Sequence, residues 1–172
     1  MKSPIKFTAL IVIAALLGFI LWRRHVMRTP EYLIRKTIAD AAEAVSRQDG
    51  ESNSANAFKM LSLSRYMDDE IALGVHGLPI DGTFGREEFV SQIARGRMML
   101  RRLEVTPVDI LIIALDSQKA VVECEVRADA ESAAGSGVKW KSDNIYHLKL
   151  EMRKVEDRWV FHSFRESDIL EK

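Results

Sequence analysis

The sequence contains a single cysteine, Cys124, among its 172 residues. One cysteine excludes an internal disulfide framework and the paired-cysteine motifs that bind structural zinc. Cys124 falls on the apolar side of an alternating segment, which predicts a buried structural thiol rather than a reactive one. Because one thiol suits reducing and oxidising surroundings equally, the sequence leaves the compartment open.

Metal-binding and nucleotide-binding motifs are also missing. The histidines show neither an i, i+4 pair nor an H-x-H motif; they are His25, His76, His147 and His162. Without such spacing we expect no metal site and no other cofactor. The sequence also lacks G-x-S-x-G, P-loop and G-x-G-x-x-G motifs, which disfavours covalent and nucleotide-dependent enzymes.

Excess positive charge is missing from the chain after residue 28. Residues 1–28 hold five basic residues and no acidic one, so the remainder has 25 − 5 = 20 basic against 25 acidic side chains, a net charge of −5. Non-specific nucleic-acid binding usually requires a basic face. We therefore expect no nucleic-acid partner.

The long apolar run of the chain, Phe7–Trp22 (FTALIVIAALLGFILW), lies between Lys6 and the pair Arg23 and Arg24. At about 1.5 Å per residue, a helix of this length falls a little short of a hydrocarbon core of about 30 Å. The terminal tryptophan suits the membrane interface, and the flanking basic side chains can snorkel. Residues 1–28 are therefore predicted to be a single-pass membrane anchor that contacts lipid.

A cleaved signal peptide is the alternative for this segment, because the run is only slightly longer than a typical h-region. No A-x-A cleavage site and no lipobox cysteine follow it, which favours an uncleaved anchor. The side of the membrane stays open, because three arginines follow the run whereas two lysines and the α-amino group precede it.

The remaining residues, 29–172, predict one α+β domain. Thr29, Pro30 and Glu31 form a typical helix start, with a hydroxyl cap, a proline and an acid. Pro107 predicts an edge position or a bulge in its strand. The apolar spacing predicts helices over 30–47, 55–64 and 85–100, a turn over 78–83, and strands over 66–77, 103–115, 119–130, 144–155 and 158–164.

Four arginines gather near the end of the third predicted helix: Arg95, Arg97, Arg101 and Arg102. One interpretation of this cluster is an anion or phosphate site. The other, which we favour, is solvated charge that complements the negative end of a helix.

The order of these elements resembles that of the nuclear transport factor 2-like superfamily, also called the SnoaL-like or cystatin-like cone. Three segments carry the resemblance: YMDDEIALGVHG (66–77), GREEFVSQI (85–93) and VEDRWVFHSF (155–164). The resemblance implies a curved antiparallel sheet wrapped around three helices in the order α-α-β-α-β-β-β-β, with a pocket at its open end. Such a pocket can hold catalytic groups, a ligand, a partner's side chain or nothing.

The resemblance includes ketosteroid isomerase, which implies an aspartate base on the first strand and an oxyanion hole of a tyrosine and a neutral aspartic acid. Matching that strand places Gly74 where the base would sit. His76 and Asp81 fall near the pocket mouth but out of register, and Tyr32 comes too early in its helix for a pocket tyrosine. His162 could point into the pocket, so the weak catalytic candidates are His76, Asp81 and His162.

The predicted pocket lining is mostly apolar, which fits either a filled core or a site for an apolar ligand. A packed, hydrogen-bonded role for its one histidine is favoured over a catalytic one. The lining residues are Tyr66, Val122, Cys124, Tyr146, Leu148, Leu150 and His162.

The leading functional hypothesis rests on two features together: the predicted membrane anchor, and the absence of the aspartate base at Gly74. We expect a membrane-anchored, non-catalytic binding or assembly domain that contacts another protein or a second copy of itself as a homodimer. The alternative is a carrier or sensor of a small hydrophobic ligand. The second alternative is a lyase or isomerase of the polyketide cyclase or ketosteroid isomerase type.

Overall fold

The computed structural model describes residues 29–75, 81–132 and 141–167. The chain divides into two compact units, residues 1–34 and 35–172, and each is described by itself. In the described residues no helix is long and apolar enough to cross a membrane. The predicted anchor, Phe7–Trp22, lies outside the described residues, as do His25 and His76.

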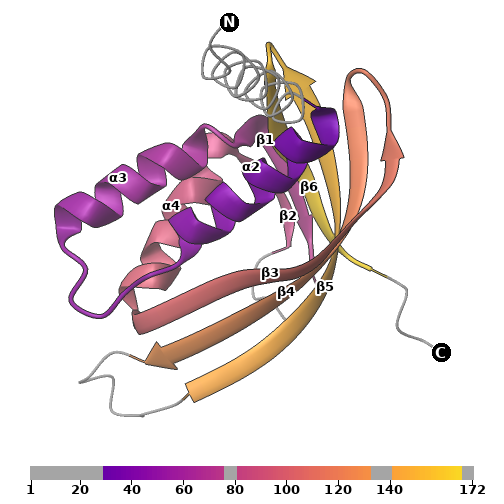
Figure 1. Ribbon diagram of the computed structural model, residues 1–172. Coiled ribbons are helices and arrows are strands. Elements are labelled where there is room, and N and C mark those ends of the chain that lie inside the picture. Colours follow the sequence, from indigo (N-terminus) through magenta and orange to yellow (C-terminus); the bar gives the residue numbers. More distant parts are fainter. Residues whose placement is uncertain (1–28, 76–80, 133–140, 168–172) are drawn as a thin grey trace, which may run out of the picture. The chain divides into compact units, whose positions relative to one another are not determined.

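The described residues form three helices and six strands (Figure 1). They are α2 (Pro30–Val45), α3 (Asn53–Ser64), β1 (Met67–Gly74), β2 (Gly82–Gly85), α4 (Arg86–Met98), β3 (Leu100–Leu115), β4 (Lys119–Ser132), β5 (Lys141–Val155) and β6 (Arg158–Glu166). In the first unit, the amides of Tyr32 and Leu33 donate to the hydroxyl and carbonyl oxygens of Thr29, at 3.4 and 3.1 Å. The predicted helix start at Thr29 and Pro30 is thereby confirmed.

The sheet is mixed, which corrects the predicted antiparallel sheet of five strands. Its order is β2-β1-β6-β5-β4-β3, and β1 and β6 run parallel. No hairpin joins these two strands, so no turn forces them to run in opposite directions. The sixth strand, β2, lies in and just after the predicted turn and pairs with β1 through Thr83 and Phe84.

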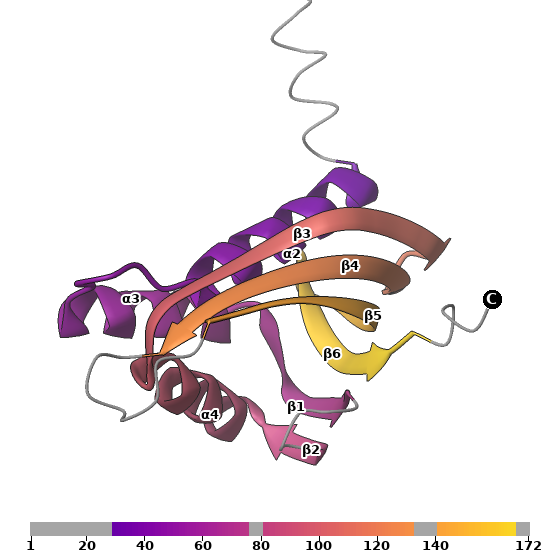
Figure 2. The same ribbon diagram turned by 90° about the horizontal axis from the view of Figure 1, so that it is seen from below.

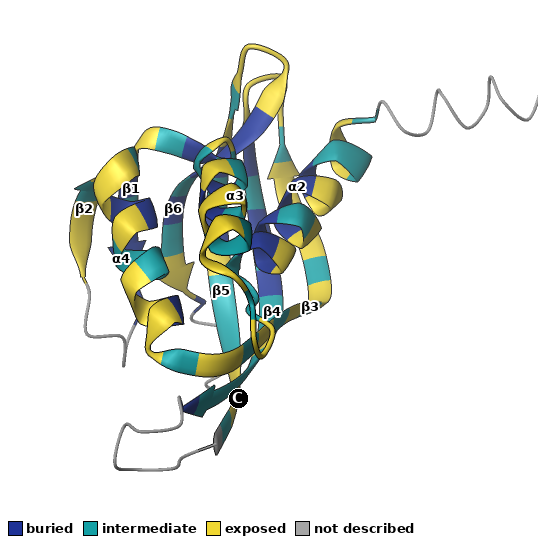
Figure 3. Ribbon diagram, turned by 90° about the vertical axis from the view of Figure 1, so that its left-hand side faces the viewer, coloured by how far each residue is buried: buried dark blue, intermediate teal, exposed yellow. Residues whose placement is uncertain are grey.

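In the second unit the sheet is curved, and α3, α4 and the later turns of α2 lie on its concave side (Figures 1 and 2). The helix faces turned towards the sheet are buried, whereas their outer faces are exposed (Figure 3). The ring of Phe164 stacks on Phe161 and Phe89, with centroids 5.0 and 5.8 Å apart, and so connects β6 to α4. The α+β architecture with a curved sheet over three helices is as predicted.

Local turn chemistry fixes the two long hairpins. In the β3–β4 turn, the Asp116 carboxylate accepts hydrogen bonds from the amides of Gln118 and Lys119, both at 2.7 Å. In the β5–β6 turn, Glu156 adopts a positive φ of 55°. Pro107 lies on β3, which is an edge strand, beside a register shift between Pro107 and Asp109. The edge and bulge predicted from this proline are thus both confirmed.

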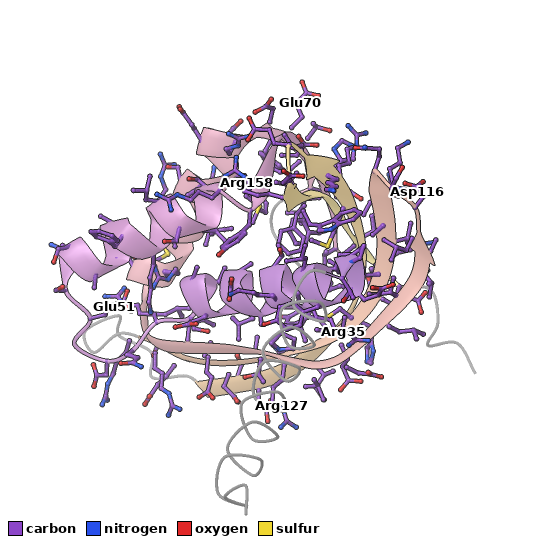
Figure 4. All side chains as sticks on the ribbon, turned by 45° about the horizontal axis from the view of Figure 1, so that its top comes forward. Arg35, Glu51, Glu70, Asp116, Arg127 and Arg158 are labelled. Carbon is purple, nitrogen blue, oxygen red and sulfur yellow. The ribbon has the colours of Figure 1, made fainter. Side chains whose placement is uncertain are left out.

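Arg97 fits neither interpretation of the arginine cluster, the anion site or the solvated charge, because it is buried with only 1% of its surface exposed. Its guanidinium donates to the Glu51 carboxylate and the Ser46 carbonyl oxygen, at 2.7 and 2.9 Å, and to the side-chain oxygen of Asn56. Lys59 also binds Glu51, at 2.7 Å. These contacts tie α4 to α3 and to the α2–α3 connection, where Figure 4 shows Glu51.

The other members of the arginine cluster are exposed and are therefore closer to the favoured interpretation. Arg101 forms an ion pair with Asp49 at 2.8 Å, and Arg102 pairs with Glu104 at 2.6 Å. Exposed pairs of this kind contribute little to stability.

The charges around Glu51 also set its protonation. Burial of the carboxyl acts to raise its pKa, but the hydrogen bond from Lys59 and the positive charge of Arg97 outweigh burial, so the pKa lies below its ordinary value of 4.5. A carboxyl whose pKa is lowered by folding stabilises the fold above its unfolded pKa. This contribution is lost as the pH falls through the lower, folded pKa.

We predict that Glu51→Gln lowers the free energy of unfolding at pH 7 by about 3 kcal/mol, because the buried Arg97 loses its charged partner. The difference between wild type and variant should narrow below pH 4.5, since a protonated Glu51 resembles glutamine. Urea unfolding at pH 7 and pH 3 measures both differences. The control Glu104→Gln, in an exposed pair, should cost less than about 1 kcal/mol. An equal difference for Glu51→Gln at the two pH values would contradict this account.

Candidate functional site

An apolar cavity of about 140 Å³ lies between the sheet and the helices of the second unit. All the side chains that line it are apolar: Ile38, Ala41, Ala42, Val45, Leu63, Met67, Phe89, Ile93, Val105, Pro107, Val126, Leu148, Leu150, Phe161 and Phe164. An engineered apolar cavity of about 150 Å³ in another protein stays dry and binds benzene. The cavity here is therefore large enough for one small, uncharged ring.

The structure brings two of the seven predicted pocket residues to this cavity, Leu148 and Leu150. Val122 and Cys124 are buried on the strand beside them but are not part of the lining. Tyr146 pairs with Val126, which does line the cavity, but its own hydroxyl accepts a hydrogen bond from Asn144 at 3.4 Å.

Tyr66 lies at a different place, in a surface depression between α2 and α3. Its hydroxyl donates to the Asp40 carboxylate at 3.0 Å, beside Lys59 and Ser62. Burial, followed by the hydrogen bond to Asp40 and its negative charge, raises the pKa of Tyr66 above its ordinary value of 10.0. Tyr66 is thus a protonated hydrogen-bond donor to a helix residue and does not line the cavity.

His162 pairs with Asp68 where β6 meets β1. His162 Nδ1 lies 3.0 Å from Asp68 Oδ2, and the side chains are 25% and 15% exposed. With a neutral imidazole and an ionised carboxylate, this contact is a hydrogen bond from Nδ1–H to Asp68 Oδ2, and Nε2 then carries a lone pair. Arg153 lies 3.8 Å from the same Asp68 oxygen.

Neither member of the pair lines the cavity, although each directly follows a residue that does. Asp68 directly follows Met67 on β1, and His162 directly follows Phe161 on β6; both preceding residues line the cavity. The β1–β6 register shifts here, because Met67 pairs with Phe161 whereas the next pair is Ala72 with Ser163. Such irregularities re-aim side chains and are common near functional sites.

The sequence reasoning kept His162 but missed Asp68. No spacing rule brings these residues together, because they are 94 positions apart and their strands are parallel. The acidic pair at positions 68 and 69 was a visible signal, but it also suited the polar start of a strand.

Of the other two catalytic candidates, Asp81 belongs to the described residues and His76 does not. Asp81 is exposed, and its carboxylate lies near Gly74, 3.8 Å from where a Cβ at that position would be. His147 lies 3.8 Å from Glu125 in a second depression, which also contains Asp109 and Glu123. Among the described residues, no three His, Cys, Asp or Glu side chains are arranged to hold a metal ion.

Comparisons with known proteins give no sequence match but many structural ones. No protein-family model and no curated protein sequence matches the chain. One similar structure is a protein from Streptomyces avermitilis, named as a candidate dehydratase of the NTF2-like family. It aligns with a TM-score of 0.60 and 14% identity, over 80% of this chain and 95% of that one. The described domain has the nuclear transport factor 2-like fold.

Two further structures agree with this fold. A protein from Novosphingobium aromaticivorans, named as a candidate scytalone dehydratase, aligns with a TM-score of 0.56 and 15% identity, over 77% of this chain and 79% of that one. Hexachlorocyclohexane dehydrochlorinase LinA-type3 from Novosphingobium barchaimii aligns with a TM-score of 0.60 and 12% identity, over 80% and 84%. At these identities the shared property is the fold.

These names correct the expectation of a non-catalytic binding or assembly domain. The similar structures carry the names of enzymes, two dehydratases and a dehydrochlorinase. The expectation rested on Gly74 at the position of the isomerase base. It failed because one fold can carry different catalytic groups, so the missing isomerase base excludes only that one arrangement.

The buried cysteine provides a test of the sheet beside the cavity. Cys124 is 3% exposed, and burial, together with the negative charges of Asp109 and Glu125, raises its pKa to about 11. We predict that native Cys124 reacts at least about 100-fold more slowly at pH 8 than the urea-unfolded chain, because the thiolate is the reactive form. A chromogenic disulfide reagent measures both rates. Comparable rates would show that this part of the sheet opens readily.

Proposed function

We propose that the domain is a lyase or isomerase in which His162, held by Asp68, is the general base. The observation that carries this proposal is the 3.0 Å contact between His162 Nδ1 and Asp68 Oδ2. A histidine that donates Nδ1–H to a carboxylate is fixed in one tautomer and presents Nε2 as a base. The names of the similar structures support the same reaction class, because dehydration and dehydrochlorination both begin or proceed with removal of a proton from carbon.

The step assigned to His162 is a proton transfer from carbon to Nε2. In a lyase, the electron pair of the broken C–H bond forms a double bond as a leaving group departs with its own electron pair. In an isomerase, the proton returns to a different carbon. Asp68 stabilises the imidazolium that forms in either case.

The cavity limits the kind of substrate. Because its lining offers no polar side chain, a charged group placed inside would lose its hydration without compensation. An uncharged ring of about benzene size fits the volume. For this reaction the C–H must reach Nε2 of His162, a residue that directly follows Phe161 of the lining but does not itself line the cavity.

We predict that His162→Gln slows proton removal at least about 100-fold, the usual contribution of a positioned general base. The full-length chain would be incubated in D₂O with a panel of uncharged cyclic ketones and cyclic halides. Proton NMR then follows deuterium uptake and alkene formation. Asp68→Asn should also slow the reaction, because an amide does not hold the Nδ1–H tautomer in the same way.

Arg158→Gln is the matched control, because Arg158 is exposed and pairs with Glu156 in the β5–β6 turn. It should react like the wild type. An unchanged rate in His162→Gln would contradict the proposal. Benzene binding, followed by thermal shift, should persist in His162→Gln. Benzene binding without turnover of any compound would instead favour the carrier or sensor hypothesis, which the apolar cavity also supports.

We also propose that residues 7–22 anchor the protein in a membrane as a single helix. The apolar run, its terminal tryptophan and its basic flanks support this proposal. The anchor would bring the domain close to membrane-dissolved apolar compounds, the class of molecule that the cavity accommodates.

We predict that the full-length chain stays in the membrane fraction at alkaline pH, whereas a chain that begins at Thr29 does not. Carbonate extraction followed by immunoblotting measures the difference, and a reporter fused after Lys172 gives the side of the membrane. Release of the intact full-length chain by carbonate would contradict the anchor.

A further inference from the structure

We infer that Arg86 is a positioning residue for the Asp68–His162 pair. This inference rests on the proposed function, because it assigns the residue that holds the carboxylate of the general base. Arg86 is the first residue of α4 and directly follows Gly85, the last residue of β2. It touches neither His162 nor the cavity lining in the contacts described above, so its action passes through Asp68 and Asp69.

The segment that carries Asp68 lacks regular sheet support. On one side, the register of β1 with β2 begins at Glu70; on the other, the register with β6 passes from Met67 directly to Ala72. Within the described strands, Asp68 and Asp69 therefore have no ladder partner. Four residues of β1 face the single residue His162 of β6. Contacts outside the ladder must hold this segment.

Arg86 supplies two of these contacts. Its Nε donates to the main-chain oxygen of Asp68 at 3.4 Å, and its guanidinium donates to the Asp69 carboxylate at 2.6 Å. The Asp69 amide in turn donates to the second carboxylate oxygen of Asp68 at 2.9 Å. Arg86 thus binds the carbonyl oxygen of the 68–69 peptide and the side chain of Asp69, and the amide of the same peptide binds the Asp68 carboxylate that contacts His162.

The strand pairing before α4 holds the main chain of Arg86 in place. Gly85 and Phe84 pair with Glu70 and Ile71 of β1, so the start of α4 is held beside the unsupported segment. Figure 2 shows β1, β2 and the adjoining end of α4 together at one side of the second unit. A guanidinium suits the task because its separate N–H groups can reach two acceptors in fixed directions, which a lysine ammonium does not do.

The test compares Arg86→Gln and Arg86→Lys with the control Arg158→Gln in the full-length chain. The first readout is the low-field proton NMR signal of His162 Nδ1–H, which reports the hydrogen bond to Asp68. It should broaden or disappear in Arg86→Gln and weaken in Arg86→Lys, but persist in the control. The second readout is the D₂O assay, where Arg86→Gln should lower kcat roughly tenfold with KM unchanged, because only orientation is lost.

A purely structural role of Arg86 would change the melting temperature but not the Nδ1–H signal. If Arg86 only stabilised the fold, Arg86→Gln would lower the melting temperature and leave the Nδ1–H signal of the folded fraction intact, and that result would overturn the inference. If Arg86→Gln fails to fold, Asp69→Asn removes the same ion pair more gently, and an unchanged Nδ1–H signal there overturns the inference equally.

The two proposals fail separately. Full activity in His162→Gln would overturn the general base, whatever Arg86 does to the NMR signal. A normal Nδ1–H signal in Arg86→Gln would overturn the positioning role and leave the general base in place. A wild-type chain without any such signal would overturn both, because the pair itself would not form in solution.

Discussion

The parallel pairing of β1 with β6 joins the two parts of the sheet. On one side of this pair lies β2, which leads into α4, and on the other lie the long hairpins of β5, β4 and β3. The cavity draws Met67 from β1 and Phe161 and Phe164 from β6, so part of its wall forms where these strands meet. The Asp68–His162 pair spans the same junction. This part of the cavity wall and the titratable pair therefore depend on one long-range pairing.

Side-chain placement and regular strand pairing compete at this junction. A regular ladder would satisfy the main chain of β1 with β6, whereas the observed shift leaves Asp68 and Asp69 to side-chain contacts. Irregular pairing costs stability, and proteins keep it where it aims a side chain. The stacked rings of Phe89, Phe161 and Phe164 lie close by and supply apolar packing that offsets part of this cost.

The features that the sequence predicted well are local ones. The hairpins follow from alternating side chains and from turn residues such as Asp116, whose carboxylate binds the next amides. The edge position of β3 follows from Pro107, which cannot donate to a ladder. The curved α+β fold was implied by the resemblance of their order to the nuclear transport factor 2-like superfamily, and the apolar side of β5 supplied Leu148 and Leu150 to the cavity.

The features that the sequence did not predict depend on distant partners. The direction of β1 relative to β6 is set by packing, and no local pattern encodes it. In the sequence, Arg97 looks like a surface arginine. It is buried because the carboxylate of Glu51, 46 positions away, pairs with it. Asp68 likewise could not be selected from the sequence, because its partner His162 lies 94 positions away. An ion pair is a property of two residues together, and a single sequence shows only its separate members.

The edge strand β3 bears on how the protein behaves at high concentration. It exposes Val108, Leu111 and Ile113 at the rim of the sheet, where an unpaired strand can recruit a strand of another chain. The main chain of Arg47 occupies part of this rim through two hydrogen bonds with Leu103, at 2.7 and 3.0 Å. Bulges interrupt much of the remainder. The α2–α3 connection therefore also acts as a guard against cross-β aggregation, so loosening it would expose a template for fibril growth.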